Sequence, residues 1–226
     1  MTYRVTYELD QDLFDDTERA LPKPGAVVFG PRYEDWHLNA CLNYVTTESQ
    51  WSWYADGYKT AGDFLAQFAD AARGEVDTLI FPVAFNYRQY LELRLKELLM
   101  VCSSYQGEKF QLPTHHDLMG LWGLLRPRLA SLDFGDEATV GVEHVIREFN
   151  KLDVGSFSFR YPVGKDGTTP SLPGITHINL GQLRDRIAEV AWLLDGFSAG
   201  MSEYLDQKCQ YEAEMRAEAA RYEQGW

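Results

Sequence analysis

The longest regular pattern in the sequence is an apolar stripe close to its C-terminal end. Its members recur every three or four residues, which is the spacing of one face of an α-helix. They are Leu183, Ile187, Val190, Leu194, Phe197, Met201, Tyr204, Tyr211 and Met215, interrupted by Lys208. A helix of roughly forty residues rises about 60 Å, more than one domain of this size requires. The stripe therefore predicts a long helix whose second half is covered by another chain or by a partner protein.

Several earlier segments also show helical spacing. The most regular is residues 77–102, and further helices are expected from about residue 55, after Thr114 and over residues 136–152. Thr114 carries a hydroxyl that can cap the helix following it. These patterns predict a mainly α fold, a helical bundle in which residues 55–226 form one domain.

The N-terminal part lacks this periodicity. Residues 3–10 alternate between apolar and polar side chains, as a half-buried strand does, and residues 26–30 are expected to pair with them. We therefore predict that residues 1–54 form an irregular extension with a small β element. A second alternating segment, residues 156–180, predicts a small hairpin or an ordered loop.

Composition restricts the classes of function. The net charge of −13 repels nucleic acid at long range, so RNA contacts need a local basic patch. The three cysteines are widely separated, which predicts neither a disulfide framework nor a metal site. Without a long apolar run or a secretory signal, we expect a cytoplasmic protein that is not embedded in a membrane and carries no cofactor.

Four segments occur in an order that resembles the HEPN superfamily. They are GYKTAGDFLAQF, LIFPVAFNYRQYLELRLKELL, THHDLMGLW and FRYPVGKDG, within about residues 55–205. The elements that carry the resemblance are Glu92 to Lys96 and His116-Asp117-Leu118. What the resemblance implies is a helical bundle, homodimerisation through helical faces, and a role in toxin–antitoxin, antiviral defence or RNA processing systems.

HEPN nucleases usually carry an arginine followed four to six residues later by a histidine. Arg160 is the nearest positional counterpart, but residues 163–166 supply no histidine. The pair Arg32 and His37 has the right spacing but precedes the predicted bundle. The resemblance therefore favours a binding or regulatory module. The alternative is a metal-independent endoribonuclease in which Arg160 stabilises the phosphate and His177 accepts the proton.

Four further charged side chains are candidate ligand contacts, with RNA or a nucleotide as the candidate ligand. Arg88, Glu92 and Lys96 recur at four-residue spacing opposite a leucine-rich flank. They form either an exposed or partly buried ion ladder or a surface that positions a ligand phosphate. Lys165 lies in a GKDGT turn that matches only part of a phosphate-binding loop.

Each candidate also has a purely structural interpretation. Arg160 pairs with Glu92 or Asp166 in that interpretation and fixes its loop. His115 and His116 point in different directions at a helix start, where capping explains them better than metal binding. A third possible function is that of a structural protein that binds a homodimer mate or a cognate partner through its last helix.

Overall fold

The computed structural model describes residues 23–42, 46–72, 75–130 and 136–224. The chain divides into two compact units, Met1–Tyr44 and Val45–Trp226. The first unit contains a short 3₁₀ helix, η2 (Trp36–Leu38). The predicted strand at residues 3–10 lies outside the described residues. Residues 28–30 form bends and none of residues 26–30 belongs to a strand, so the prediction of a strand there is wrong. Val27, Val28 and Phe29 are at least 79% exposed, so the segment lacks the buried face of a half-buried strand.

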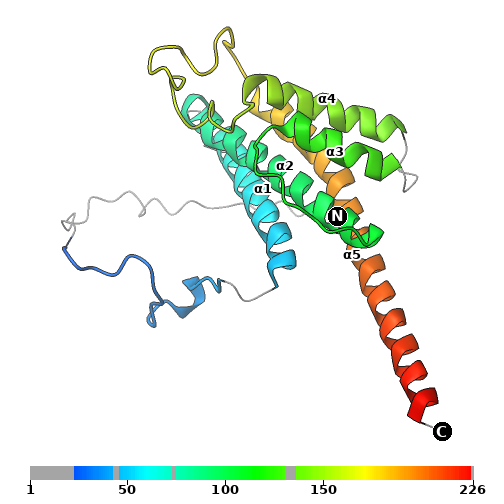
Figure 1. The fold of residues 1–226 in the computed structure, drawn as a ribbon. Helices are drawn as coiled ribbons and strands as arrows, with labels where there is room; N and C mark the ends of the chain where they lie inside the picture. The colour runs from blue at the N-terminus through cyan, green and yellow to red at the C-terminus, as the bar shows by residue number, and fades with distance from the viewer. Residues whose placement is uncertain (1–22, 43–45, 73–74, 131–135, 225–226) are drawn as a thin grey trace. The chain divides into compact units, whose positions relative to one another are not determined.

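The second unit is an all-helical bundle (Figure 1). Its helices are α1 (Thr47–Ala72), α2 (Val76–Gln106), α3 (Leu118–Ala130), α4 (Asp136–Leu152) and α5 (Leu180–Gln224). Helix α2 contacts α1, α3 and α5, while α4 contacts α3 and α5. The mainly α prediction is confirmed. Helix α1 begins earlier than residue 55, where the apolar period first becomes clear.

Helix α2 is the central helix of the bundle because both of its flanks are covered. The apolar side chains that it buries include Tyr87, Leu91, Leu95 and Leu98, all with no exposed area. Charged side chains on the opposite flank are buried as well. An isolated amphipathic helix would have a solvated face there, so the periodicity alone does not predict this burial.

A close approach of α1 and α2 depends on a glycine. A Cβ atom placed on Gly62 would lie 2.7 Å from Cε1 of Tyr87, closer than side-chain carbons come to one another. The Tyr87 hydroxyl donates a hydrogen bond to Asp63 Oδ1 at 2.8 Å, which holds its ring against this glycine. Burial, together with Asp63, raises the pKa of Tyr87, so the hydroxyl keeps its proton.

Helix α3 begins later than expected. The backbone N–H of Met119 donates to Asp117 Oδ1 at 3.1 Å, so Asp117 caps the helix in place of Thr114. The N–H of Leu118 donates to Asn150 Oδ1 of α4 at 3.0 Å. A residue distant in sequence therefore helps to fix where α3 starts, which local capping rules do not include.

The segment between α4 and α5 is an ordered loop. Oδ1 of Asp153 accepts hydrogen bonds from the N–H groups of Phe157 and Ser158, at 2.5 and 3.0 Å. Among the described residues the β pairing consists of one isolated bridge, between Val163 and Pro170. The loop alternative of the prediction is therefore correct. The alternation did not mark a strand, because the Asp153 carboxylate folds residues 157–160 into a turn.

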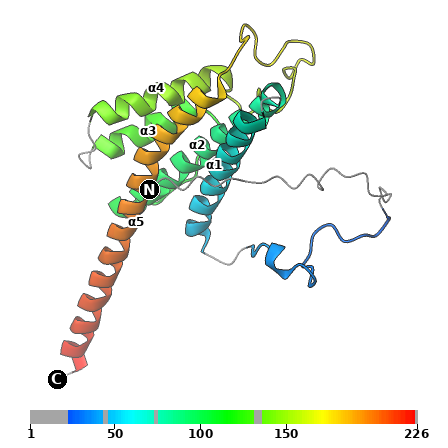
Figure 2. The ribbon, with the colours of Figure 1, turned by 180° about the vertical axis from the view of Figure 1, so that it is seen from behind.

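Helix α5 continues well past the bundle, as Figures 1 and 2 show. The long C-terminal helix is thus confirmed. Its first half buries Ile187, Val190 and Leu194 against the other helices. Beyond Met201, every described side chain is exposed or only partly buried. None of the described helices is long and apolar enough to span a bilayer.

Candidate functional site

The candidate site is a group of charged side chains on one flank of α2. We call Arg88, Glu92, Lys96, His116 and Asp153 the Arg88 cluster. The guanidinium of Arg88 has no exposed area and donates to Glu92 Oε2 at 2.7 Å. It also donates to the backbone carbonyls of His116 at 2.5 Å and Asp153 at 3.1 Å. One buried arginine thus ties α2 to the residues before α3 and after α4.

Glu92 is the acceptor at the centre of the cluster. Its Oε1 lies 2.8 Å from Lys96 Nζ and 2.8 Å from His116 Nδ1. The side chains of Glu92 and Lys96 are 3% and 9% exposed. The predicted ladder of Arg88, Glu92 and Lys96 is therefore real in spacing, but it is buried more deeply than either sequence interpretation assumed. The segment that leads into α3 folds back over this flank and covers it.

The carboxyl of Glu92 remains ionised at neutral pH. Burial opposes its ionisation, but hydrogen bonds from Lys96, Arg88 and His116 outweigh that effect and lower its pKa below the ordinary value. A carboxylate accepts hydrogen bonds and donates none. The nearby Nδ1 of His116 must therefore carry the hydrogen that lies between the two groups.

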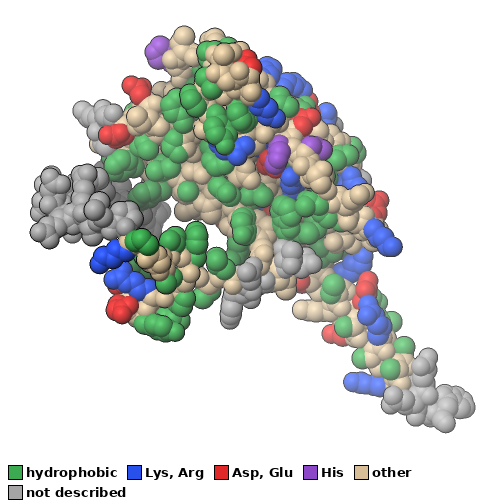
Figure 3. Space-filling view, turned by 60° about the vertical axis from the view of Figure 1, so that its left-hand side comes forward, with side chains coloured by type: hydrophobic (Ala, Val, Ile, Leu, Met, Phe, Trp, Pro, Cys, Tyr) green, Lys and Arg blue, Asp and Glu red, His purple; other side chains and the backbone are tan. Residues whose placement is uncertain are grey.

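His116 is the part of the cluster that reaches solvent. Its side chain is 55% exposed, whereas the other four are nearly sealed. Figure 3 shows histidine side chains at the surface of the bundle beside acidic and basic ones. Because Nδ1 is held by Glu92, the other ring nitrogen, Nε2, carries a lone pair in the neutral ring. Sequence reasoning treated this residue as a helix cap, and only the contact with Glu92 reveals a different environment.

The two predicted catalytic residues occupy different surroundings. The guanidinium of Arg160 lies over the rings of Phe85 and Tyr161, 5.7 and 5.6 Å from their centroids. His177 Nδ1 lies 3.1 Å from the Thr176 hydroxyl. In the described part of the chain, no hydrogen bond or ion pair joins Arg160 to His177. His177 instead lines a hollow of about 420 Å³ between α4 and α5.

The expected ion pairs of Arg160 are absent from the described residues. Glu92 is bonded within the Arg88 cluster, and Asp166 accepts hydrogen bonds from Thr168 and Thr169 in its own turn. These bonds lower the pKa of Asp166 to about 2. Arg160 is held by aromatic rings instead, a contact that the sequence alone does not indicate.

The remaining predicted contacts are exposed. Lys165 lies in a turn that Gly167 permits through its positive φ of 74°. Arg32 pairs with Asp35 at 3.2 Å in the first unit and is 73% exposed. His37 lies in η2, and no carboxylate of the described residues of that unit pairs with it.

A second group of charges lies further along α2, and we call Arg94, Glu97, Asp56 and Asp195 the Arg94 cluster. Arg94 Nη2 lies 2.5 Å from Asp56 of α1, and its Nε lies 2.8 Å from Asp195 of α5. Its Nη1 donates to Glu97. Because the partners belong to three helices, this cluster joins α1, α2 and α5.

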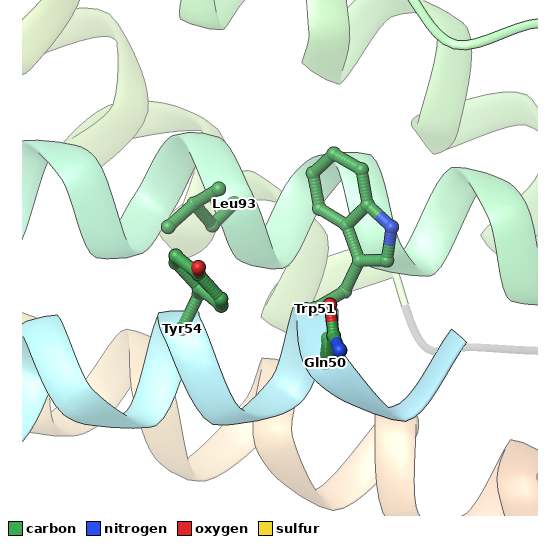
Figure 4. A pocket seen from close by; sticks show the side chains of 4 residues that line it. All are labelled: Gln50, Trp51, Tyr54 and Leu93. Atoms are coloured by element: carbon green, nitrogen blue, oxygen red, sulfur yellow. The ribbon is translucent and has the colours of Figure 1, made fainter. Parts of the chain in front are cut away.

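An apolar hollow of about 290 Å³ opens between α1 and α2 (Figure 4). Trp51 and Tyr54 of α1 and Leu93 of α2 line it, and Gln50 lies at its edge. Trp53 and Tyr54 are 54% and 60% exposed, so these aromatic side chains at the start of α1 do not belong to the packed core. The hollow offers contact area but few polar groups that would select a ligand.

Within the described residues, no group of three or more His, Cys, Asp or Glu side chains is arranged to hold a metal ion. No family model, curated protein or solved structure matches this chain.

Proposed function

We propose that this chain is a HEPN-like binding or regulatory module of a bacterial defence or stress system, which assembles as a homodimer or with a cognate protein through α5. The observation that carries the proposal is the exposed apolar surface of the projecting half of α5. Tyr204, Tyr211 and Met215 are 51%, 63% and 48% exposed there. Trp192, in the first half, is 79% exposed. Exposed apolar side chains along one face of a helix, even where Lys208 interrupts them, are typical of a surface that another chain covers.

The HEPN-like part of the proposal is supported by the position of its two motif elements. Glu92 to Lys96 lies on α2, and His116-Asp117-Leu118 begins α3. The two elements meet at the contact between Glu92 and His116. Segments that resemble one family in sequence therefore also lie together in space.

Binding is favoured over ribonuclease activity by the state of the charged groups. Arg88 and Lys96 are paired with carboxylates inside the protein, so neither presents a free cation to a phosphate. Arg160 stacks on aromatic rings, and His177 lines a hollow between α4 and α5. The described residues show no hydrogen bond or ion pair between the two groups, which supports binding over cleavage.

Light scattering of the full chain tests the assembly. We expect the mass of a dimer at micromolar concentration, and a monomer for a chain that ends after Gln207, because the truncation removes Tyr211 and Met215. Tyr211→Glu should weaken the dimer, since a charge enters the apolar stripe. Gln210→Glu is the matched control, because it adds the same charge one position away and should leave the mass unchanged.

A monomeric full-length chain with the stability of the truncated one would contradict self-assembly through α5. For the nuclease alternative, we expect little metal-independent cleavage of tRNA or mRNA. Robust cleavage that Arg160→Ala abolishes would establish that alternative. Cleavage lost only with His37→Ala would instead assign it to the N-terminal Arg32 pair.

A further inference from the structure

The Arg88 cluster contains one group that the proposed function does not use, the half-exposed imidazole of His116. Its Nδ1 is 2.8 Å from the buried carboxylate of Glu92, and its backbone carbonyl accepts a hydrogen bond from Arg88. The ring and the backbone of one surface residue are thus both fixed from the protein interior. A carboxylate bonded to one imidazole nitrogen sets the tautomer and the orientation of the ring.

The charges around the ring define which chemistry it suits. Arg88 and Lys96 are balanced by Glu92 and Asp153, at 2.7 to 3.5 Å. Near the ring on the chain lie His115 and Asp117, and the latter caps α3. No cation of the cluster remains unpaired, so the site offers little stabilisation to a phosphoryl group that carries two negative charges. Attack on an uncharged ester needs the Nε2 lone pair and a partner for the charge that forms on the ring, and the negative charge that forms on the carbonyl oxygen is left to water. This restricts the reaction to activated esters, whose leaving group departs readily.

We propose that His116 and Glu92 form a reactive imidazole–carboxylate pair that hydrolyses small activated acyl esters. The lone pair of Nε2 attacks the carbonyl carbon, the ester C–O bond breaks, and the alkoxide or phenolate leaves. The resulting acylimidazolium keeps its Nδ1–H on Glu92, whose carboxylate balances the positive charge. Water then attacks the acyl carbon and loses one proton to solvent, the C–N bond breaks and returns the lone pair to Nε2, and the carboxylic acid product ionises. His116 is the catalytic residue and Glu92 is the positioning residue.

The burial of Glu92 supports this assignment. An ionised carboxylate that is 97% removed from solvent is expensive, and an apolar replacement of similar size often stabilises a protein as well or better. The cluster nevertheless leaves the His116 side chain 55% exposed, as a reactive imidazole requires.

The test uses the full chain and p-nitrophenyl acetate, with release of p-nitrophenolate as the readout. His116→Asn is the main variant, because its amide nitrogen takes the place of Nδ1 and preserves the bond to Glu92. His177→Asn is the matched control, since His177 is also an exposed loop histidine but is bonded to a hydroxyl. We expect His116→Asn to lose the hydrolysis above the background of the other four histidines and His177→Asn to keep it.

Glu92→Gln should lower the rate by at least about tenfold, because the carboxylate that holds the tautomer and balances the imidazolium is removed. Should that variant fail to fold, nitrogen-15 NMR of histidine-labelled full-length protein gives the second readout. We expect the Nδ1–H tautomer for neutral His116. Equal rates for the two asparagine variants, a rate no higher than that of free imidazole at matched concentration, or the Nε2–H tautomer would each overturn the proposal.

Discussion

Two ion clusters on the same helix differ in how they are balanced. The Arg88 cluster has two cations and two carboxylates, all nearly sealed, and connects α2 to loop segments. The Arg94 cluster has one cation and three carboxylates, of which Asp56 and Asp195 are 59% and 35% exposed. The difference shows that an excess of like charge is tolerated where water reaches it. In the sealed cluster each charge depends on its partner.

The largest effect is expected from removing the two arginines. Arg88→Leu leaves Glu92 and Asp153 buried with fewer partners and should lower the free energy of unfolding by about 3–5 kcal/mol. Arg94→Leu should cost less, because Asp56 and Asp195 can be hydrated. Chemical denaturation measures both values. A larger loss of stability for Arg94→Leu than for Arg88→Leu would contradict the comparison.

The control for these two variants is Arg126→Leu. Arg126 is 50% exposed and lies 2.8 Å from Glu143. A pair of this kind contributes about 0–1 kcal/mol. If Arg126→Leu destabilises as much as Arg88→Leu, the effect comes from the loss of a long side chain and burial of the ion pair is not its cause.

Acid should act through the Arg88 cluster. The pKa of Glu92 is lower in the folded protein than its ordinary value of 4.5. As pH falls, Glu92 therefore binds a proton in the unfolded chain before it does so in the folded protein. The stabilisation by Glu92 is complete above the ordinary pKa of the group and is lost as pH falls through the folded pKa. We expect Glu92→Gln to be less stable than the native chain at pH 7. The difference should shrink below pH of about 4.5 in melting curves. A difference independent of pH would show that packing is responsible.

The smallest effect concerns a single hydroxyl that is bonded to the Arg94 cluster. Ser198 Oγ donates to Glu97 Oε1 at 2.6 Å, and Ser52 donates to the same oxygen at 2.7 Å. Ser198→Ala should lower stability by about 1.5 kcal/mol, as expected for one hydrogen bond to a charged group. Ser202→Ala, at an exposed position of the same helix, should change stability by less than about 0.5 kcal/mol. Equal losses would indicate that Ser52 alone satisfies Glu97.

The sequence alone predicted the elements that depend on residues close to one another in the chain. The apolar periods of α4 and α5 located both helices, and α4 occupies the predicted residues 136–152. The start of α1 was missed because its first turns carry exposed aromatic side chains such as Trp53 instead of an apolar stripe. The sharp turn after α4 was missed because its organiser is a carboxylate, Asp153, whose role depends on geometry.

The site was less predictable because its contacts are not local. The spacing of Arg88, Glu92 and Lys96 was visible, but their burial depends on the chain that folds back between α2 and α3. His116 meets Glu92 only through that fold. Arg160 was expected to find a carboxylate and lies on Phe85 and Tyr161 instead. Apolar periodicity describes one helix at a time, whereas these contacts join α2 to the segment before α3 and to the loop after α4.

The unbroken course of α5 fixes a distance as well as a surface. With 45 residues and a rise of about 1.5 Å per residue, its two ends are about 67 Å apart. A molecule bound near Tyr211 would be held at a set separation from the bundle and at a set rotation about the helix axis. Inserting one residue into the projecting half would turn that molecule by about 100°, and inserting a whole turn would move it outward with little rotation. The number of residues in α5 would therefore set both the distance and the rotation of the bound molecule relative to the bundle.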